Sequence, residues 1–181
     1  MTNTLKGGVI LVTALWVGGL FAIGFIVAPY LFALAARHDA AVPNTGVAAS
    51  LIGPLLYGTD VLGLVVAVAL GVGLLALRRR NVVPLGGRLY LSEVALGLAF
   101  ICAGVNYWVF TPRVNAARDR LAGAYGEFHL ADKADPLFRQ FTTLHQTSTA
   151  IFMVGFGAAL VTLVCLSQLR TDVARSDATA A

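Results

Sequence analysis

Four long stretches of the chain carry almost only apolar residues, and short polar segments separate them. The stretches lie at about residues 8–32, 53–77, 89–110 and 141–169. Each is long enough to cross a bilayer as a helix, which needs about 20 apolar residues. Their apolar runs are continuous rather than alternating, which excludes membrane-spanning β-strands. The pattern therefore predicts an all-α, polytopic membrane protein built as a four-transmembrane-helix bundle.

The polar segments between these stretches predict where helices begin and end. Thr111 and Pro112 are typical of a helix N-cap followed by proline at the first helical position, so we expect a short interfacial helix in the third loop. Asp135 and Pro136 predict the same capping at the start of the fourth helix. The tail 170–181 lacks apolar residues to bury and is predicted to be disordered. Residues 1–169 would then form one transmembrane domain.

The first apolar stretch has an alternative interpretation as a cleaved signal peptide. Lys6 precedes the stretch, and Ala33-Leu34-Ala35 resembles a cleavage site. The apolar region of a signal peptide is only about 7–15 residues long, and this stretch is roughly twice that length. We therefore expect a retained first helix.

Small residues recur at four-residue spacing in three of the four stretches. Such residues let membrane helices approach closely, where the hydrophobic effect cannot drive their association. The spacing therefore predicts a compact bundle. The positions concerned are Gly18 and Ala22, then Ala95, Ala99 and Ala103, then Gly155 and Ala159.

The composition agrees with a chain surrounded by lipid. Hydrophobic residues make up 58% and charged residues 12% of the 181 residues, whereas soluble domains are about a quarter charged. The net charge of +4 does not indicate nucleic-acid binding, because the basic residues gather beside the ends of the apolar stretches. The triple arginine 78–80 is the strongest such group, and it predicts that both termini lie in the cytoplasm.

Polar residues of three stretches are expected at similar depth in the outer half of the membrane. Such residues usually face the interior of a bundle, because lipid offers them no partner. One interpretation gives them a packing role, with His145 on an inward face among aromatic residues. The other is a layer that binds a small cation or relays a proton. The residues are Asp60, Asn106, His145 and Ser148.

The chain carries no motif of a recognisable enzyme, cofactor site or metal site. We find no Ser-His-Asp order, phosphate loop or Cys-x-x-Cys. One histidine inside a span is too few for haem held by two histidines, and one His with one Asp is too few for a transition-metal cage. We therefore predict a non-enzymatic bundle in the lipid bilayer without cofactor or metal, acting through partners or as a homo-oligomer. The alternative is a transport component for a small solute, a metal ion or protons, and a haem- or quinone-linked redox subunit is a third hypothesis.

Several short motifs resemble the bacterial branch of the transmembrane protein 205-like family, a domain of unknown function with four predicted spans. The chain reads Trp-Gly-Gly with Val17 inserted after the tryptophan, then Ala-Pro-x-x-Phe at residues 28–32 and Phe-x-x-Leu-His-x-x-Ser at 141–148. The resemblance covers nearly the whole chain. It implies a four-span fold in the bacterial inner membrane but no reaction. Asp60 is not part of the pattern. The positions that match it are Gly18, Gly19, Pro29, Phe32, His145 and Ser148.

Overall fold

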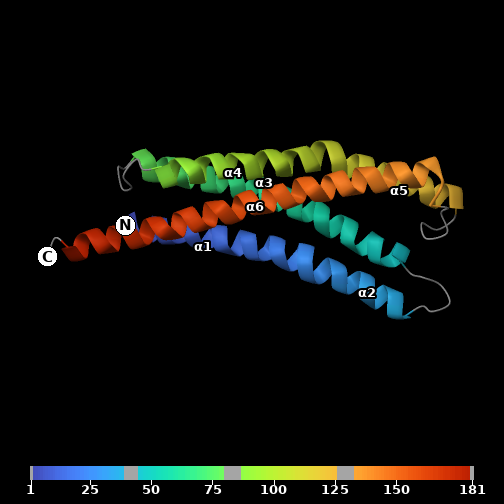
Figure 1. Cartoon of the computed structure of the whole chain (residues 1–181), viewed down its shortest axis with the longest axis horizontal. Coiled ribbons are helices and arrows are strands. Elements are labelled where there is room, and N and C mark those ends of the chain that lie inside the picture. The colour runs from blue at the N-terminus through green and yellow to red at the C-terminus, as the bar shows by residue number, and fades with distance from the viewer. Residues whose placement is uncertain (1, 39–44, 80–86, 126–132, 180–181) are drawn as a thin grey trace.

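The computed structural model describes residues 2–38, 45–79, 87–125 and 133–179, and these parts contain helices and no β-strand. Figure 1 shows the helices running along one long axis. They are α1 (Thr2–Phe21), α2 (Ala28–His38), α3 (Thr45–Arg79), α4 (Gly87–Val105), α5 (Thr111–Tyr125) and α6 (Pro136–Thr179). Two π-helical segments complete the described elements, η1 (Ala22–Val27) and η2 (Asn106–Phe110). The predicted all-α class is confirmed.

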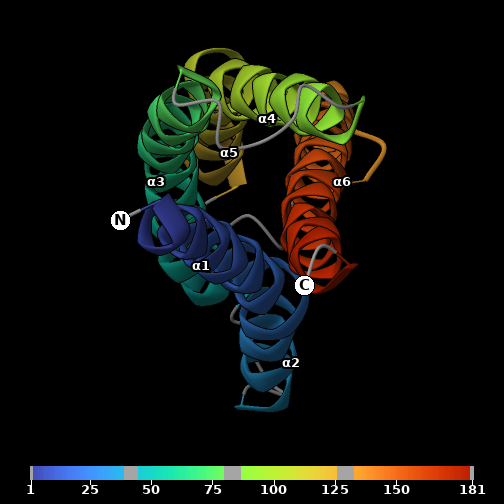
Figure 2. The ribbon, with the colours of Figure 1, turned by 90° about the vertical axis from the view of Figure 1, so that its left-hand side faces the viewer.

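Four of these helical rods are long and apolar enough to cross a membrane. Their apolar parts are Thr4–Leu31, Gly53–Arg79, Gly87–Tyr125 and Pro136–Gln168. Neighbours in the chain are neighbours in space, because α1 packs on α3, α3 on α4, α4 on α6, and α6 again on α1. Viewed end-on, α1, α3, α4 and α6 form a ring (Figure 2). The predicted four-helix bundle is confirmed.

The outer surface of the bundle is apolar along the length of these helices. Leu15 is 67% exposed, Val65 62% and Ile101 60%, and each lies in the middle of its helix. A soluble protein rarely exposes apolar surface so continuously, whereas a membrane surrounds such a surface with hydrocarbon. The chain is therefore a multi-pass membrane protein.

Large aliphatic side chains fill the half of the bundle that lies nearer the two termini. Leu70, Leu74 and Leu77 of α3 pack there with Leu89 of α4 and Leu166 of α6, and each of the five is at most 4% exposed. They close this half of the ring with apolar groups. The polar groups that line the cavity described in the next subsection lie beyond them, toward the other end.

The contact between α4 and α6 is built from small and hydroxyl-bearing residues. On α4 these residues are Ser92, Ala95, Ala99 and Cys102, all buried. On α6 they are Gly155, Ala158, Ala159 and Thr162. Both series follow three- and four-residue spacing, which keeps one face of each helix against the other. The prediction that small residues let helices of the bundle pack closely is confirmed for Ala95, Ala99, Gly155 and Ala159.

Two observations fix the register of this antiparallel pair, which we call the α4–α6 seam. Thr162 donates a hydrogen bond from its hydroxyl to the backbone carbonyl of Ser92, at 3.5 Å, as well as to Ala158 of its own helix. One heptad along, a β-carbon built on Gly155 would lie 3.0 Å from the Cβ of Cys102 and 3.9 Å from the carbonyl oxygen of Ala99. Any side chain at position 155 would therefore press on Cys102, and the two helices would have to move apart by a few tenths of an ångström.

The first helix does not use its small residues in the same way. Gly18 is exposed, and no atom lies within 4 Å of a β-carbon built on it. The prediction that Gly18 packs inside the bundle is therefore wrong. The helix turns Val9, Thr13 and Trp16 inward instead, at the same three- and four-residue spacing. Spacing identifies a face of a helix, but only the neighbouring helices decide whether that face is covered.

Each π-helical segment directly precedes a proline. Pro29 follows η1, and Pro112 follows η2, each by two residues. In an α-helix a proline ring collides with the carbonyl four residues earlier. Here those carbonyls belong to Phe25 and Trp108, inside the wider π turns. The π turns let both helices continue through their prolines.

The continuous helix at Pro112 corrects one sequence prediction. Thr111 has helical dihedral angles, φ −57° and ψ −46°, and its N–H bonds to the carbonyl of Asn106 five residues earlier. An N-cap residue would be non-helical. Helix α5 is present over the expected residues, but it continues the third span instead of starting anew.

The predicted N-cap of the fourth helix is confirmed. Leu137 donates its backbone N–H to Asp135 Oδ1 at 2.6 Å, and Arg139 donates to the Asp135 carbonyl at 3.1 Å. The Tyr125 hydroxyl donates to Asp135 Oδ2 and so connects the end of α5 to the start of α6. The Tyr125 hydroxyl, and after it the Leu137 amide, lower the pKa of Asp135 below its ordinary value. The cap is therefore a carboxylate at neutral pH.

Helix α6 extends further than the sequence predicted. It continues to Thr179, through most of the tail 170–181 for which disorder was expected. The segment 170–179 contains neither glycine nor proline, and adding residues to an existing helix requires no new nucleation. A lack of apolar residues therefore did not end the helix.

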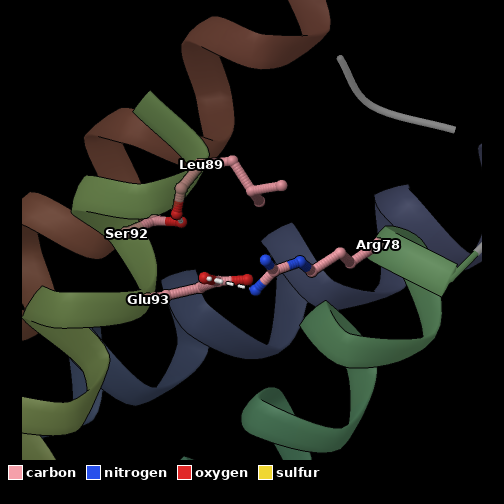
Figure 3. A network of polar contacts seen from close by, with 4 residues as sticks. All are labelled: Arg78, Leu89, Ser92 and Glu93. Atoms are coloured by element: carbon pink, nitrogen blue, oxygen red, sulfur yellow. Dashed lines mark hydrogen bonds and ion pairs between the residues drawn. The ribbon is translucent and has the colours of Figure 1, made fainter. Parts of the chain in front are cut away.

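An ion pair connects α3 and α4 at the end of the bundle where the termini lie. Arg78 Nη1 and Glu93 Oε2 are 3.5 Å apart, and both side chains are partly exposed (Figure 3). Ser92, the residue before Glu93, donates its hydroxyl to the carbonyl of Leu89, about one turn earlier in α4, at 2.7 Å. Glu93 thus has a cationic neighbour at the end of its span.

The seam makes a prediction about two glycines of α6. Gly155→Ala places its methyl group against the Cys102 Cβ, which cannot move without the backbone, so we expect a loss of about 1–3 kcal/mol in stability. Gly157→Ala is the matched control, because nothing lies within 4 Å of a β-carbon there. Thermal unfolding of both variants in detergent measures the difference. Equal midpoint temperatures would contradict the close approach of α4 and α6.

Candidate functional site

A small cavity lies between the four helices, on the far side of the leucine-filled half. Its volume is about 30 Å³, and all four spans contribute to its wall. The wall is mostly apolar, with a few polar groups among small and aromatic side chains. The lining residues are Trp16 and Leu20, then Thr59, Asp60 and Gly63, then Ala99, Cys102, Ala103 and Asn106, and finally Phe152, Gly155 and Phe156.

Asn106 and Ser148 form a reciprocal polar pair at the end of the α4–α6 seam. The Asn106 side-chain NH₂ donates to the Ser148 carbonyl at 3.2 Å, and the Ser148 hydroxyl donates to Asn106 Oδ1 at 3.2 Å. Asn106 is only 4% exposed. Its position as the first residue of η2 brings its amide onto α6. The pair provides hydrogen bonds for the buried amide of Asn106, in a region where lipid offers no hydrogen-bond partner.

Asp60 has a hydroxyl group as its partner. Thr111 donates its side-chain hydrogen to Asp60 Oδ2 at 3.1 Å and so connects α3 to the end of η2. Thr59, the residue before Asp60, uses its own hydroxyl within α3, donating to the carbonyls of Leu55 and Leu56. The sequence predicted Thr111 as a helix cap, so this role as the neighbour of a carboxylate was missed.

His145 lies outside this arrangement. Its side chain is exposed, and its ring stacks on Phe141 of the same helix, with the ring centres 5.7 Å apart and the planes at 6°. The expected inward face is therefore wrong for His145. The structure brings Asp60 and Asn106 to one cavity and bonds Ser148 to Asn106, but it leaves the histidine at the surface.

Trp16 is the cavity residue with an unsatisfied polar atom. Its side chain is 7% exposed, and among the residues that the structure describes, its Nε1 is the one buried side-chain nitrogen or oxygen without a hydrogen-bond partner. From the sequence, this tryptophan stands out only as part of the Trp-Gly-Gly motif. The signal that could have found it is the spacing Val9, Thr13, Trp16, which is the buried face of α1.

The remaining positions of the family-like pattern do not meet at the cavity. Gly18 and Gly19 lie on the exposed side of α1, with no atom near a built β-carbon. Pro29 is exposed in α2, and Phe32 lies in α2 with its side chain outside the described residues. These positions therefore lie on the surface of α1 and near the π-helical segment η1, and they do not form a single site.

Double-mutant analysis tests the Asn106–Ser148 pair. Asn106→Ala and Ser148→Ala should each destabilise the protein, and we expect a coupling energy of about 1 kcal/mol because either change removes the bond from the Ser148 hydroxyl to Asn106 Oδ1. Thr149→Ala is the control, since its hydroxyl bonds only to the His145 carbonyl in its own helix among the contacts described. Unfolding equilibria in bicelles supply the four stabilities. Strictly additive effects would be evidence against the pair.

Comparison with known proteins gives a family but no activity. No curated protein and no solved structure matches the chain. The sequence model of one family, described as a domain of unknown function (DUF4149), matches residues 11–122. The match includes Trp16, Asp60, Asn106 and Thr111, whereas Ser148 and His145 follow it. Because the matched region is more than half of its length, the chain belongs to the DUF4149 family of domains of unknown function.

Proposed function

We propose that this protein is a non-enzymatic, self-associating bundle of the bacterial inner membrane, within a transmembrane protein 205-like branch of its family. The branch assignment is supported by the motifs around Trp16, Pro29 and His145. Cytoplasmic termini are supported by the position of Arg78 and Arg79, which end α3 at the same end of the bundle as both termini (Figure 1). Basic residues at the end of a span favour the cytoplasmic side.

The observation that carries self-association is the uncovered face of α1. Gly8, Val12, Leu15 and Gly19 follow four-, three- and four-residue spacing, so they share one side of the helix. All four are exposed, and nothing lies within 4 Å of a β-carbon built on either glycine. Small residues on a lipid-facing side permit close backbone contact with another helix.

A groove beside this face supports the same proposal. It lies between α1 and α3, has a volume of about 490 Å³ and is open to the surroundings. Gly8 and Val12 form part of its α1 wall, and the small residues Ala69 and Gly73 form part of its α3 wall. A ridge of side chains from a helix of a second copy fits such a groove. Two copies related by a twofold axis would each present the same face, as in most homodimers.

Substitution on the α1 face tests self-association. Gly19→Leu and Gly8→Leu add bulk where the bundle has no neighbour, so we expect a normally folded monomer and an affinity between copies that is about ten-fold weaker. Gly97→Leu is the matched control, because it is also exposed with nothing nearby but lies on α4, across the ring. Energy transfer between labelled copies in vesicles gives the affinity. If Gly97→Leu weakens it equally, or if the unmodified protein is monomeric, this proposal is wrong.

A second candidate function is a transport component for protons or a small solute. The observation that favours it is the position of Asp60. This carboxylate belongs to a membrane-spanning helix and lines the cavity between the helices. Intramembrane carboxylates commonly lie on ion and proton pathways. The leucine-filled half argues against a transport role, because its apolar side chains fill the bundle between the cavity and the end where the termini lie.

Flux measurements separate this candidate from the first. In proteoliposomes, a transport role predicts proton or solute flux that Asp60→Asn abolishes, whereas self-association alone predicts no flux above empty vesicles. Asp119→Asn is the control, because this carboxylate of α5 is 69% exposed. Flux that persists in Asp60→Asn would remove the role assigned to the carboxylate.

A further inference from the structure

We propose that the central cavity binds a water molecule, which connects the Trp16 indole of α1 to the Asp60 carboxylate of α3 and the Asn106 amide of η2. The site requires no partner copy and no transport, so it is independent of the proposed function. It rests on an unpaired donor, the acceptors on the same wall and the size of the space between them.

The unpaired donor is the indole N–H of Trp16. It is fully buried and has no acceptor within hydrogen-bond distance in the described parts of the chain. A β-carbon built on Gly63, another wall residue, would lie 3.6 Å from this nitrogen. A buried N–H without an acceptor is costly, and most buried donors in proteins are bonded to protein or to ordered water.

Acceptors are present on the wall of the same cavity. The Asp60 carboxylate accepts a hydrogen bond from Thr111 and the Asn106 carbonyl oxygen accepts one from Ser148. Each oxygen-bearing group has lone pairs for further bonds. None of these atoms reaches the Trp16 nitrogen directly. A molecule between them has to accept one hydrogen bond and donate others.

The size and charge of the site identify this molecule. The cavity of about 30 Å³ has room for one or two waters, since each needs about 10–15 Å³. An anion is disfavoured by the Asp60 carboxylate, and a cation by the indole N–H. Water is neutral. It can accept a hydrogen bond from the Trp16 indole and donate hydrogen bonds to the oxygens of Asp60 and Asn106.

Such a water would complete a polar connection through all four spans. Trp16 would be bonded through it to Asp60 and Asn106, and Asn106 is bonded in turn to Ser148 of α6. Asp60 continues to Thr111. Polar contacts between helices hold a bundle together in lipid, where apolar burial contributes little. The site would therefore stabilise the middle of the bundle.

Replacing Gly63 tests the site, because an alanine there adds a methyl group to the cavity without a steric clash. The built β-carbon has its nearest neighbours at 3.6 Å and 3.8 Å, which are ordinary contacts. If the cavity is hydrated, the methyl group displaces the water and leaves the indole unpaired. If the cavity is dry, the methyl group fills a void and stabilises the protein. Gly97→Ala is the matched control for helix propensity, since nothing lies near that position.

The measurements are made on the full ¹⁵N-labelled chain in nanodiscs. We expect the Trp16 indole proton to show cross-relaxation with a long-lived water in the unmodified protein and in Gly97→Ala, and to lose it in Gly63→Ala. We expect the midpoint of thermal unfolding of Gly63→Ala to lie about 2–4 °C below that of Gly97→Ala. Absence of the water signal from the unmodified protein, or a midpoint for Gly63→Ala at or above that of Gly97→Ala, would overturn the proposal.

Discussion

The close contact between α4 and α6 determines which polar groups of these two helices and of η2 face each other. Lipid gives helices no hydrophobic reason to associate, so the contact depends on residues small enough to let two backbones meet. Gly155 against Cys102 is the closest point of this contact. Because the register is fixed there, Asn106 arrives opposite Ser148 one heptad away, and the space left above Gly155 becomes the central cavity.

The two π-helical segments adapt the outer half of the bundle to its prolines. At η2 the extra residue per turn allows the helix to pass Pro112, and it also brings both Asn106 and Thr111 to the neighbouring helices. A regular α-helix advances by about 100° per residue, so it would direct one of these two side chains elsewhere. The π-helical segment η2 thus lets Asn106 bond to α6 and Thr111, five residues later, bond to α3.

Much of the fold could be predicted from hydrophobicity alone, because the membrane allows only continuous helices for such stretches. The cap at Asp135 was also predictable, since its chemistry is local. The break expected at Thr111 was wrong because a proline motif cannot distinguish a new helix from a π turn in an existing one. The site was predictable only in part. Asp60 and Asn106 stand out as polar residues in apolar runs, whereas the exposure of His145 depends on neighbouring helices that the spacing does not specify.

The uncovered face and the cavity-facing residues lie on neighbouring sides of the same helix, about 100° apart, and this separates the two proposals physically. Gly8 and Gly19 face away from the bundle, whereas Val9 and Trp16 face into it. Leucine at either exposed glycine reaches the lipid side and leaves the Trp16 environment intact, and a methyl group at Gly63 alters the cavity without touching the outer face. Association between copies and hydration of the interior can therefore be changed one at a time. A variant that altered both would show that helix α1 transmits packing changes from one side to the other.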